Sequence, residues 1–308
     1  VLDYFASYAQ HAAVGLVAEL SARGFSYDAP PGAMLYLSLP PDLVLQQPFS
    51  DYLIRRAGGE EQLQRLVKVL RDFARDTRFM SFFTTNTTTY DGMVQQVSAL
   101  VGDADVRALE AYYGMPQRGY HLILAPLIGP NGYGVRIRHA DGQYDVYSII
   151  GPFDIRAEQP FFGDQASLRN LIWHEFSHSL VNPLTERYAD RVAQYAMLYA
   201  PIAVHMWLQA YPTWEICVNE HIVRAITTRL AAHELGEQAA QEALRDEQSW
   251  GFIYIALLVR KLRVYEQQRN VYPTFSDFYP QLLTAFDEII LPVTPTSQAT
   301  GTPLPILF

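Results

Sequence analysis

The sequence of 308 residues contains a single cysteine, Cys217, and few charged residues, which make up 18% of the chain. One cysteine excludes an intrachain disulfide and any zinc site built from several thiolates. Its neighbours are apolar, so we expect a buried structural thiol. A chain without disulfides fits the cytosol and also fits a bacterial periplasm.

The chain also lacks an excess of basic residues and a long apolar run. Its formal net charge of −9 at pH 7 argues against nucleic-acid binding, which depends on basic side chains meeting phosphates. No stretch reaches the roughly 18 consecutive apolar residues that a membrane-spanning helix needs, so we predict no membrane span. The chain begins at Val1 rather than Met, which a removed signal peptide would explain, and we therefore expect a periplasmic or secreted protein.

The composition is that of a globular protein, since hydrophobic residues make up 49% of a chain long enough to bury a sizeable core. The pattern along the chain predicts an α+β fold that is mostly helical. We expect a mainly helical N-terminal region over 1–115, a second region over 116–290 and a Pro/Thr-rich tail over 291–308. The first two regions are expected to form one compact unit.

Hydrophobic spacing and turn residues predict the elements of the N-terminal region. They are a helix that ends at Gly24, a short strand at 34–39, an amphipathic helix at 60–79, a loop at 82–92 and a further helix to about 113. Three runs rich in β-forming residues follow, separated by "GPNG" and "DG". Because both separators are turn signals, we predict an antiparallel meander over 120–151, followed by helices almost to residue 290.

The stretch "NLIWHEFSHSLVNP", residues 170–183, lies in a predicted helix between Ser167 and Asn182. His174 and His178 stand one turn apart on it, so both imidazoles can face one ion. Glu175 projects beside them and can reach a water on that ion, which is the position of the general base in an HExxH hydrolase. Neutral imidazole suits zinc, so we predict Zn²⁺ as cofactor. The alternative is a pair of histidines at the edge of the core that hydrogen bonds satisfy.

A catalytic zinc usually has three protein ligands, so a third must come from elsewhere. The motif continues as "SLVNPLT", without the histidine of an extended HExxHxxGxxH motif. The best candidate is Glu220, which falls in the apolar stripe of a predicted helix over 212–234, where a carboxylate needs a cation or hydrogen bonds. Glu215 ranks lower because acids are common at helix starts, and Glu186 lies just beyond a proline.

"HEFSH" followed about forty residues later by "NEHIVRA" resembles the gluzincin type of zinc metallopeptidase. The layout is also similar to a family of secreted bacterial proteins catalogued only as a domain of unknown function. The resemblance covers mainly residues 120–235 and implies a zincin-like fold, peptidase activity and Glu220, preceded by Asn219, as the third zinc ligand. The N-terminal third matches no gluzincin pattern.

The residues after Glu220 depart from the common gluzincin form, which has small and acidic residues there. His221 follows directly and is a candidate catalytic donor to the developing oxyanion, with a buried structural histidine as the alternative. Arg224 stands one turn further on and can hold the Glu220 carboxylate from outside the metal's own ligand set. Tyr188 and Asp190 could approach the site, but packing or capping explains them as well.

These residues predict a zinc-dependent hydrolase. The first choice is a peptidase that acts on a peptide or protein substrate. An extended peptide could pair with an exposed strand edge, for which residues 131–139 are the first choice. One alternative is a non-catalytic zinc-containing module that binds peptide or glycan, although such a module has no need for Glu175 as a base. Another is a hydrolase of non-peptide amides.

Overall fold

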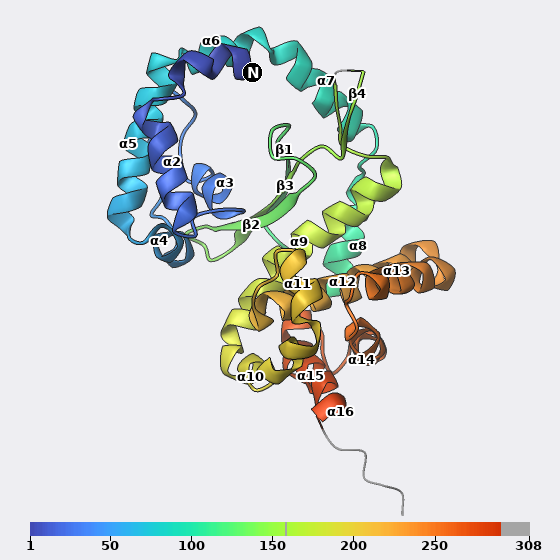
Figure 1. The fold of residues 1–308 in the computed structure, drawn as a ribbon. Helices are drawn as coiled ribbons and strands as arrows, with labels where there is room; N and C mark the ends of the chain where they lie inside the picture. Colours follow the sequence, from blue (N-terminus) through green and yellow to red (C-terminus); the bar gives the residue numbers. More distant parts are fainter. Residues whose placement is uncertain (158, 291–308) are drawn as a thin grey trace, which may run out of the picture.

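The computed structural model describes residues 1–157 and 159–290. The fold is α+β and mostly helical, with a small three-stranded sheet that precedes the long helices, as the sequence predicts. The N-terminal helices form a curved arm beside this sheet, and the C-terminal helices gather on the other side of the long helix α9 (Figure 1). The predicted tail over 291–308 lies outside the described residues.

The N-terminal region is built from helices of modest length. They are α1 (Leu2–Phe5), η1 (Ala6–Tyr8), α2 (Ala12–Ala22), α3 (Ala29–Met34), α4 (Asp51–Ala57), α5 (Glu60–Asp76), α6 (Phe79–Thr85), α7 (Thr87–Ser98) and α8 (Asp103–Tyr113). The helix predicted at 60–79 is confirmed as α5, which buries Leu63, Leu66, Val67 and Ala74 on one face. Leu63, Leu66 and Val67 join an apolar cluster made mostly of residues from α2 to α5.

Two predictions for this region are wrong. Residues 34–39 do not form a strand, because α3 runs to Met34 and only one isolated bridge, between Leu37 and Leu45, follows it. Residues 82–92 are not a loop, because α6 and α7 are both helical and only Asn86 interrupts them. Packing of Met93 and Val97 into an apolar cluster outweighs the low helix propensity of the threonine-rich stretch.

The sheet has the order β1–β3–β2, with β1 (Gly119–Leu124), β2 (Gly132–Arg138) and β3 (Tyr144–Ile150). The hairpin of β2 and β3 is antiparallel, as the "DG" turn predicts. The predicted meander is wrong for β1, which pairs in parallel with β3. The connection from β1 to β2 is too long for a tight hairpin, so β3 can lie between them and leave β2 at an edge. A small hairpin of β4 (Asp154–Arg156) and β5 (Gln159–Phe161) follows.

The rest of the chain is helical. Its elements are α9 (Gln165–Arg187), α10 (Ala189–Ala193), η2 (Ala196–Ile202), α11 (Ala203–Leu208), α12 (Trp214–Leu235), α13 (Glu237–Ser249), α14 (Ile255–Gln267), α15 (Phe275–Leu283), η3 (Thr284–Phe286) and α16 (Asp287–Ile290). The helices α9 and α12 pack against each other, and α9 also packs against β2 and β3. Their apolar side chains belong to the largest core cluster, together with the buried Cys217. Among the described helices, none has the length and apolar character needed to cross a membrane.

The motif helix is longer than predicted at both ends. Asp164, rather than Ser167, caps it, since the Asp164 carboxylate accepts a hydrogen bond from the Ser167 backbone N–H. The prediction that the helix stops at Asn182 is wrong, because it continues through Pro183 to Arg187. Burial of Leu184 and Thr185 stabilises the turns beyond the proline, which cannot donate a backbone hydrogen bond.

Candidate metal centre

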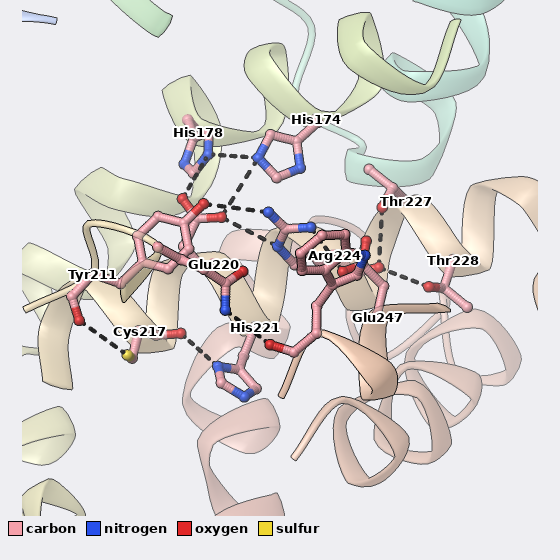
Figure 2. Close-up of polar contacts among 12 residues, drawn as sticks. His174, His178, Tyr211, Cys217, Glu220, His221, Arg224, Thr227, Thr228 and Glu247 are labelled. Carbon is pink, nitrogen blue, oxygen red and sulfur yellow. Dashed lines mark hydrogen bonds and ion pairs between the residues drawn. The ribbon is translucent and has the colours of Figure 1, made fainter. Parts of the chain in front are cut away.

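Two helices bring three potential ligands together. His174 and His178 lie one turn apart on α9, and Glu220 faces them from α12 (Figure 2). The Nε2 atoms of the two histidines are 3.1 Å apart. Glu220 places Oε2 3.6 Å from Nε2 of His174 and Oε1 3.3 Å from Nε2 of His178. These three side chains form a cluster that could hold a metal ion.

The spacing of the cluster fits a tetrahedral ion. Ligand atoms about 2.0–2.1 Å from a tetrahedral zinc lie about 3.4 Å from one another. The distances between the three donors scatter around that value. Burial and the neighbouring His178 and Arg224 hold the pKa of His174 well below its usual range, which favours the neutral imidazole that a metal needs.

A buried polar chain fixes the position of α12 against α9. The Thr185 hydroxyl donates to the side-chain oxygen of Asn219, the residue before Glu220. The same hydroxyl lies 2.6 Å from the hydroxyl of Tyr279 on α15. Because Thr185 and Tyr279 are buried, loss of these contacts would leave their hydroxyls without partners, which favours this placement of the helices. That placement turns Glu220 toward the two histidines.

Further side chains orient the donors. On α9, Nδ1 of His178 is 3.2 Å from Oδ1 of Asn182. On α12, Nε of Arg224 is 3.3 Å from Oε2 of Glu220. Arg224 also donates to Glu247 of α13 at 2.7 Å and to the Tyr211 hydroxyl at 3.3 Å (Figure 2).

Arg224 is buried at the centre of this network. Burial lowers its pKa, but the carboxylates of Glu220 and Glu247 outweigh that effect and raise it above its usual value. The guanidinium therefore stays charged and is shared between the two carboxylates. Its plane also lies against the ring of Phe252, at 4.2 Å from the ring centroid.

Glu175 lies beside the cluster, on the side where α9 meets β2. Its side chain is 5% exposed and has no ion-pair partner among the described residues. Burial raises its pKa to about 7, against opposing effects of His178 and the Gly134 backbone amide. Gly132 and Gly134 make this contact possible, since a Cβ at either position would overlap with atoms of Glu175. The absence of side chains at Gly132 and Gly134 therefore allows α9 to pack directly against β2.

The cluster opens into a cleft of about 1180 Å³. Its lining comes mainly from four parts of the fold: α9, β2 with the preceding residues 130–131, the segment from Trp207 through α12, and the N-terminal residues Gly24, Ser26, Tyr27, Asp28, Tyr52 and Arg56. Phe153 and Glu247 of α13 complete it. His174, Glu175, His178 and Glu220 all line it. The N-terminal region thus forms one wall of the cleft, a role that the sequence did not indicate.

The structure does not bring every candidate residue to the cleft. His221 is 1% exposed and lies between the rings of Phe252 and Tyr254, with Nδ1 2.8 Å from the Cys217 carbonyl. Burial lowers its pKa to about 4. It does not line the cleft, so the donor role expected for His221 has no geometric support.

The two alternative acids also lie elsewhere. Glu215 is exposed at the start of α12, and Glu186 is exposed and paired with Arg55 at 3.2 Å. Tyr188 stacks on Tyr279, and Asp190 is exposed in the first turn of α10. Glu220 is 6% exposed, which places it among the most buried acids of the described chain.

Sequence reasoning missed three contributors to the site. Tyr211 and Glu247 carry no motif, and they meet Arg224 from the segment before α12 and from α13 after it. Asn182 was taken as a helix stop, although its spacing of four residues from His178 is the signal that could have identified it.

Comparison with known families gives one result. A family model described as "Domain of unknown function (DUF4932)" matches residues 1–285, so the chain belongs to this family. No curated protein and no solved structure matches the chain.

Proposed function

We propose that this member of the DUF4932 family is a zinc-dependent hydrolase, and specifically a peptidase of gluzincin type. The observation that carries the proposal is the convergence of His174, His178 and Glu220 at a cleft, with Glu175 buried beside them. Two imidazoles and one carboxylate are the donor set of a catalytic zinc site, which leaves one position open for water or substrate.

A zinc ion held there would polarise a substrate carbonyl and lower the pKa of a coordinated water to about 7. Glu175 accepts a proton from the attacking water as the oxygen bonds to the carbonyl carbon. It then gives the proton to the leaving amine as the C–N bond breaks. Burial without an ion-pair partner suits this role, because it brings the proton affinity of Glu175 close to neutral pH.

Tyr211 is the residue best placed to stabilise negative charge on the carbonyl oxygen. It lines the cleft, and its hydroxyl meets Arg224 at 3.3 Å beside Glu220. Burial and the nearby Glu220 raise its pKa, so the phenol remains protonated and can donate a hydrogen bond. We therefore assign to Tyr211 the role that the sequence had suggested for His221.

A structural zinc site in a non-catalytic module fits these residues less well. Such sites are closed by four protein ligands, whereas only three candidate donors meet here among the described residues. A buried carboxylate without an ion-pair partner also costs stability, and a non-catalytic module would gain nothing from it.

Metal content and protease activity together test the proposal. We expect the purified protein to contain about one zinc per chain and to cleave an unfolded protein such as casein. A chelator should abolish cleavage and added zinc should restore it. A protein that holds no zinc, or one that cleaves equally well after chelation, would overturn the proposal.

A further inference from the structure

The charged side chains of the cleft are bound to one another. Asp28 is 3.4 Å from Arg56, and Glu247 is 2.7 Å from Arg224, which also holds Glu220. Apart from the two candidate ligand histidines and Glu175, no charged side chain lining the cleft is outside these pairs within the described residues. The cleft therefore offers a substrate no unpaired charge beyond the reaction centre.

Arg56 of α4 also forms hydrogen bonds with the backbone of the loop that contains Gly24 and Ser26. It donates to the carbonyl oxygens of Gly24 and Ser26, each at 2.8 Å, and it also contacts the Tyr52 hydroxyl. Together with the bond to Asp28, these bonds use four of the five N–H groups of the guanidinium, so it cannot hold the carboxylate of a substrate with two parallel hydrogen bonds.

Aromatic side chains form part of the remaining lining of the cleft, beside uncharged polar side chains such as Asn131, Asn170 and Gln209. Its lining includes Tyr27, Tyr52, Tyr133, Phe153, Trp207 and Tyr211. Two of them are unusually open: Tyr27 is 62% exposed and Trp207 is 67% exposed. Large apolar side chains that face solvent within a concave surface are typical of binding sites.

The backbone has positive φ angles at or near both of these exposed aromatic residues. Tyr27 has φ of 59°, a left-handed conformation that residues other than glycine rarely adopt, and Arg56 donates hydrogen bonds to two carbonyls that precede it, those of Gly24 and Ser26. Ala210, between Trp207 and Tyr211 in the lining, has φ of 67°. The strained backbone therefore lies at Tyr27 itself and three residues after Trp207.

We infer that the cleft binds an internal segment of a polypeptide whose side chains next to the scissile bond are apolar or aromatic, and that Tyr27 and Trp207 select it. The inference rests on the proposed peptidase function. Enzymes that act at a chain end need a charged group to hold the terminal amine or carboxylate, and the paired charges leave none. The volume of about 1180 Å³ also exceeds the roughly 300–1,000 Å³ typical of sites for small ligands, which disfavours a small non-peptide amide.

The test compares end-blocked, internally quenched peptides of equal length. One carries Phe and Leu on both sides of the central bond, and a second carries Asp and Lys at the same positions. We expect kcat/KM for the apolar peptide to be at least about tenfold higher, since burying one large apolar side chain is worth that much or more. Trp207→Ala and Tyr27→Ala should remove most of this preference. Trp250→Ala is the matched control, because Trp250 is equally exposed but does not line the cleft.

Binding separates this inference from the proposed function. The Glu175→Gln variant should bind the labelled apolar peptide more tightly than the charged peptide in fluorescence anisotropy, and Trp207→Ala in that background should weaken the binding. If this binding preference holds while the parent protein cleaves nothing, the peptidase proposal fails, and of the inference only the selection of apolar segments by the cleft stands. Equal binding and cleavage of both peptides, or binding of neither, would overturn the inference. A preference for peptides with free ends would overturn its internal-segment part.

Discussion

The Nδ1 atom of His178 and the Oδ1 atom of Asn182 lie 3.2 Å apart, one turn from each other on α9. An amide oxygen only accepts hydrogen bonds, so this contact places the imidazole proton on Nδ1. The lone pair of Nε2 then points toward His174 and Glu220, as a metal ligand requires. Asn182 thereby sets the tautomer of His178 without touching the proposed ion.

Asn182→Ala should therefore weaken zinc binding by roughly 10- to 100-fold, the usual effect of losing such a partner. Competition with a chromophoric chelator measures the change. Asn170→Ala is the control, since Asn170 is exposed on the same helix and lines the cleft without a hydrogen bond to either histidine. Equal zinc affinities in the two variants would contradict the role given to Asn182.

Replacement of either histidine should remove the metal. His174→Ala and His178→Ala each leave two of the three donors, and we expect zinc content to fall from about one per chain to near zero after dialysis. Elemental analysis of the purified proteins checks this. His205→Ala, an exposed histidine on α11, should retain full zinc. Full occupancy in both motif variants would mean that the ligands lie elsewhere.

Glu175→Gln should retain zinc and fold while losing hydrolysis by about 10²–10⁴-fold, the range attributed to a general base. The amide keeps the shape of the side chain but cannot accept the proton of the attacking water. Turnover of a quenched peptide, compared with that of the exposed Glu186→Gln, measures the loss. Activity close to that of the parent would remove Glu175 from the mechanism.

The two glutamates of α12 should differ sharply. Glu220→Ala should lower zinc affinity more strongly than Asn182→Ala, because it deletes a direct donor. Glu215→Ala should leave zinc affinity unchanged, since that side chain faces solvent at the start of the helix. Circular dichroism checks that the Glu220 variant remains folded with Arg224 deprived of one partner. The reverse order of the two affinities would refute the ligand assignment.

Gly134→Ala should disturb the contact of β2 with α9. A Cβ there would overlap with the Glu175 backbone carbonyl and would come within 2.9 Å of the His178 Cβ. Overpacking of this kind costs about 1–3 kcal/mol or more in the free energy of unfolding, and it should also lower activity by displacing Glu175. Gly15→Ala, at an exposed helical position with open space, should be neutral or stabilising by up to about 1 kcal/mol. Chemical denaturation of both variants tests the difference.

The candidate metal donors could be predicted from the sequence because helical spacing is a local property. His174 and His178 share a face because they are four positions apart, and Glu220 stood out as an acid within an apolar stripe. Which acid reaches the histidines is a tertiary question, and packing of α12 on α9 through Thr185 and Asn219 decides it. Nothing local in the sequence reports that contact.

The fold shows the same limit. The long periodic helix α5 and the "DG" hairpin were predictable from local pattern. The parallel pairing of β1 with β3 depends on the path of the connection between β1 and β2, which the local pattern does not specify. The helical state of the threonine-rich stretch depends on the apolar cluster against which it packs. The division of the chain at about residue 115 stays a prediction. The N-terminal residues contribute one wall of the cleft, so the two regions serve one site.

Because the N-terminal region contributes this wall, the residues proposed for catalysis and those proposed for substrate choice lie in different parts of the sequence. The proposed metal ligands and general base lie between residues 174 and 220. One of the residues proposed to select the substrate, Tyr27, lies in a loop about 150 positions earlier. Changes in that loop can redirect the choice of substrate without touching the donor cluster. If the proposed function holds, family members with the same HExxH helix are expected to differ in substrate wherever this loop differs. A survey by the motif alone would then group proteins that act on different substrates.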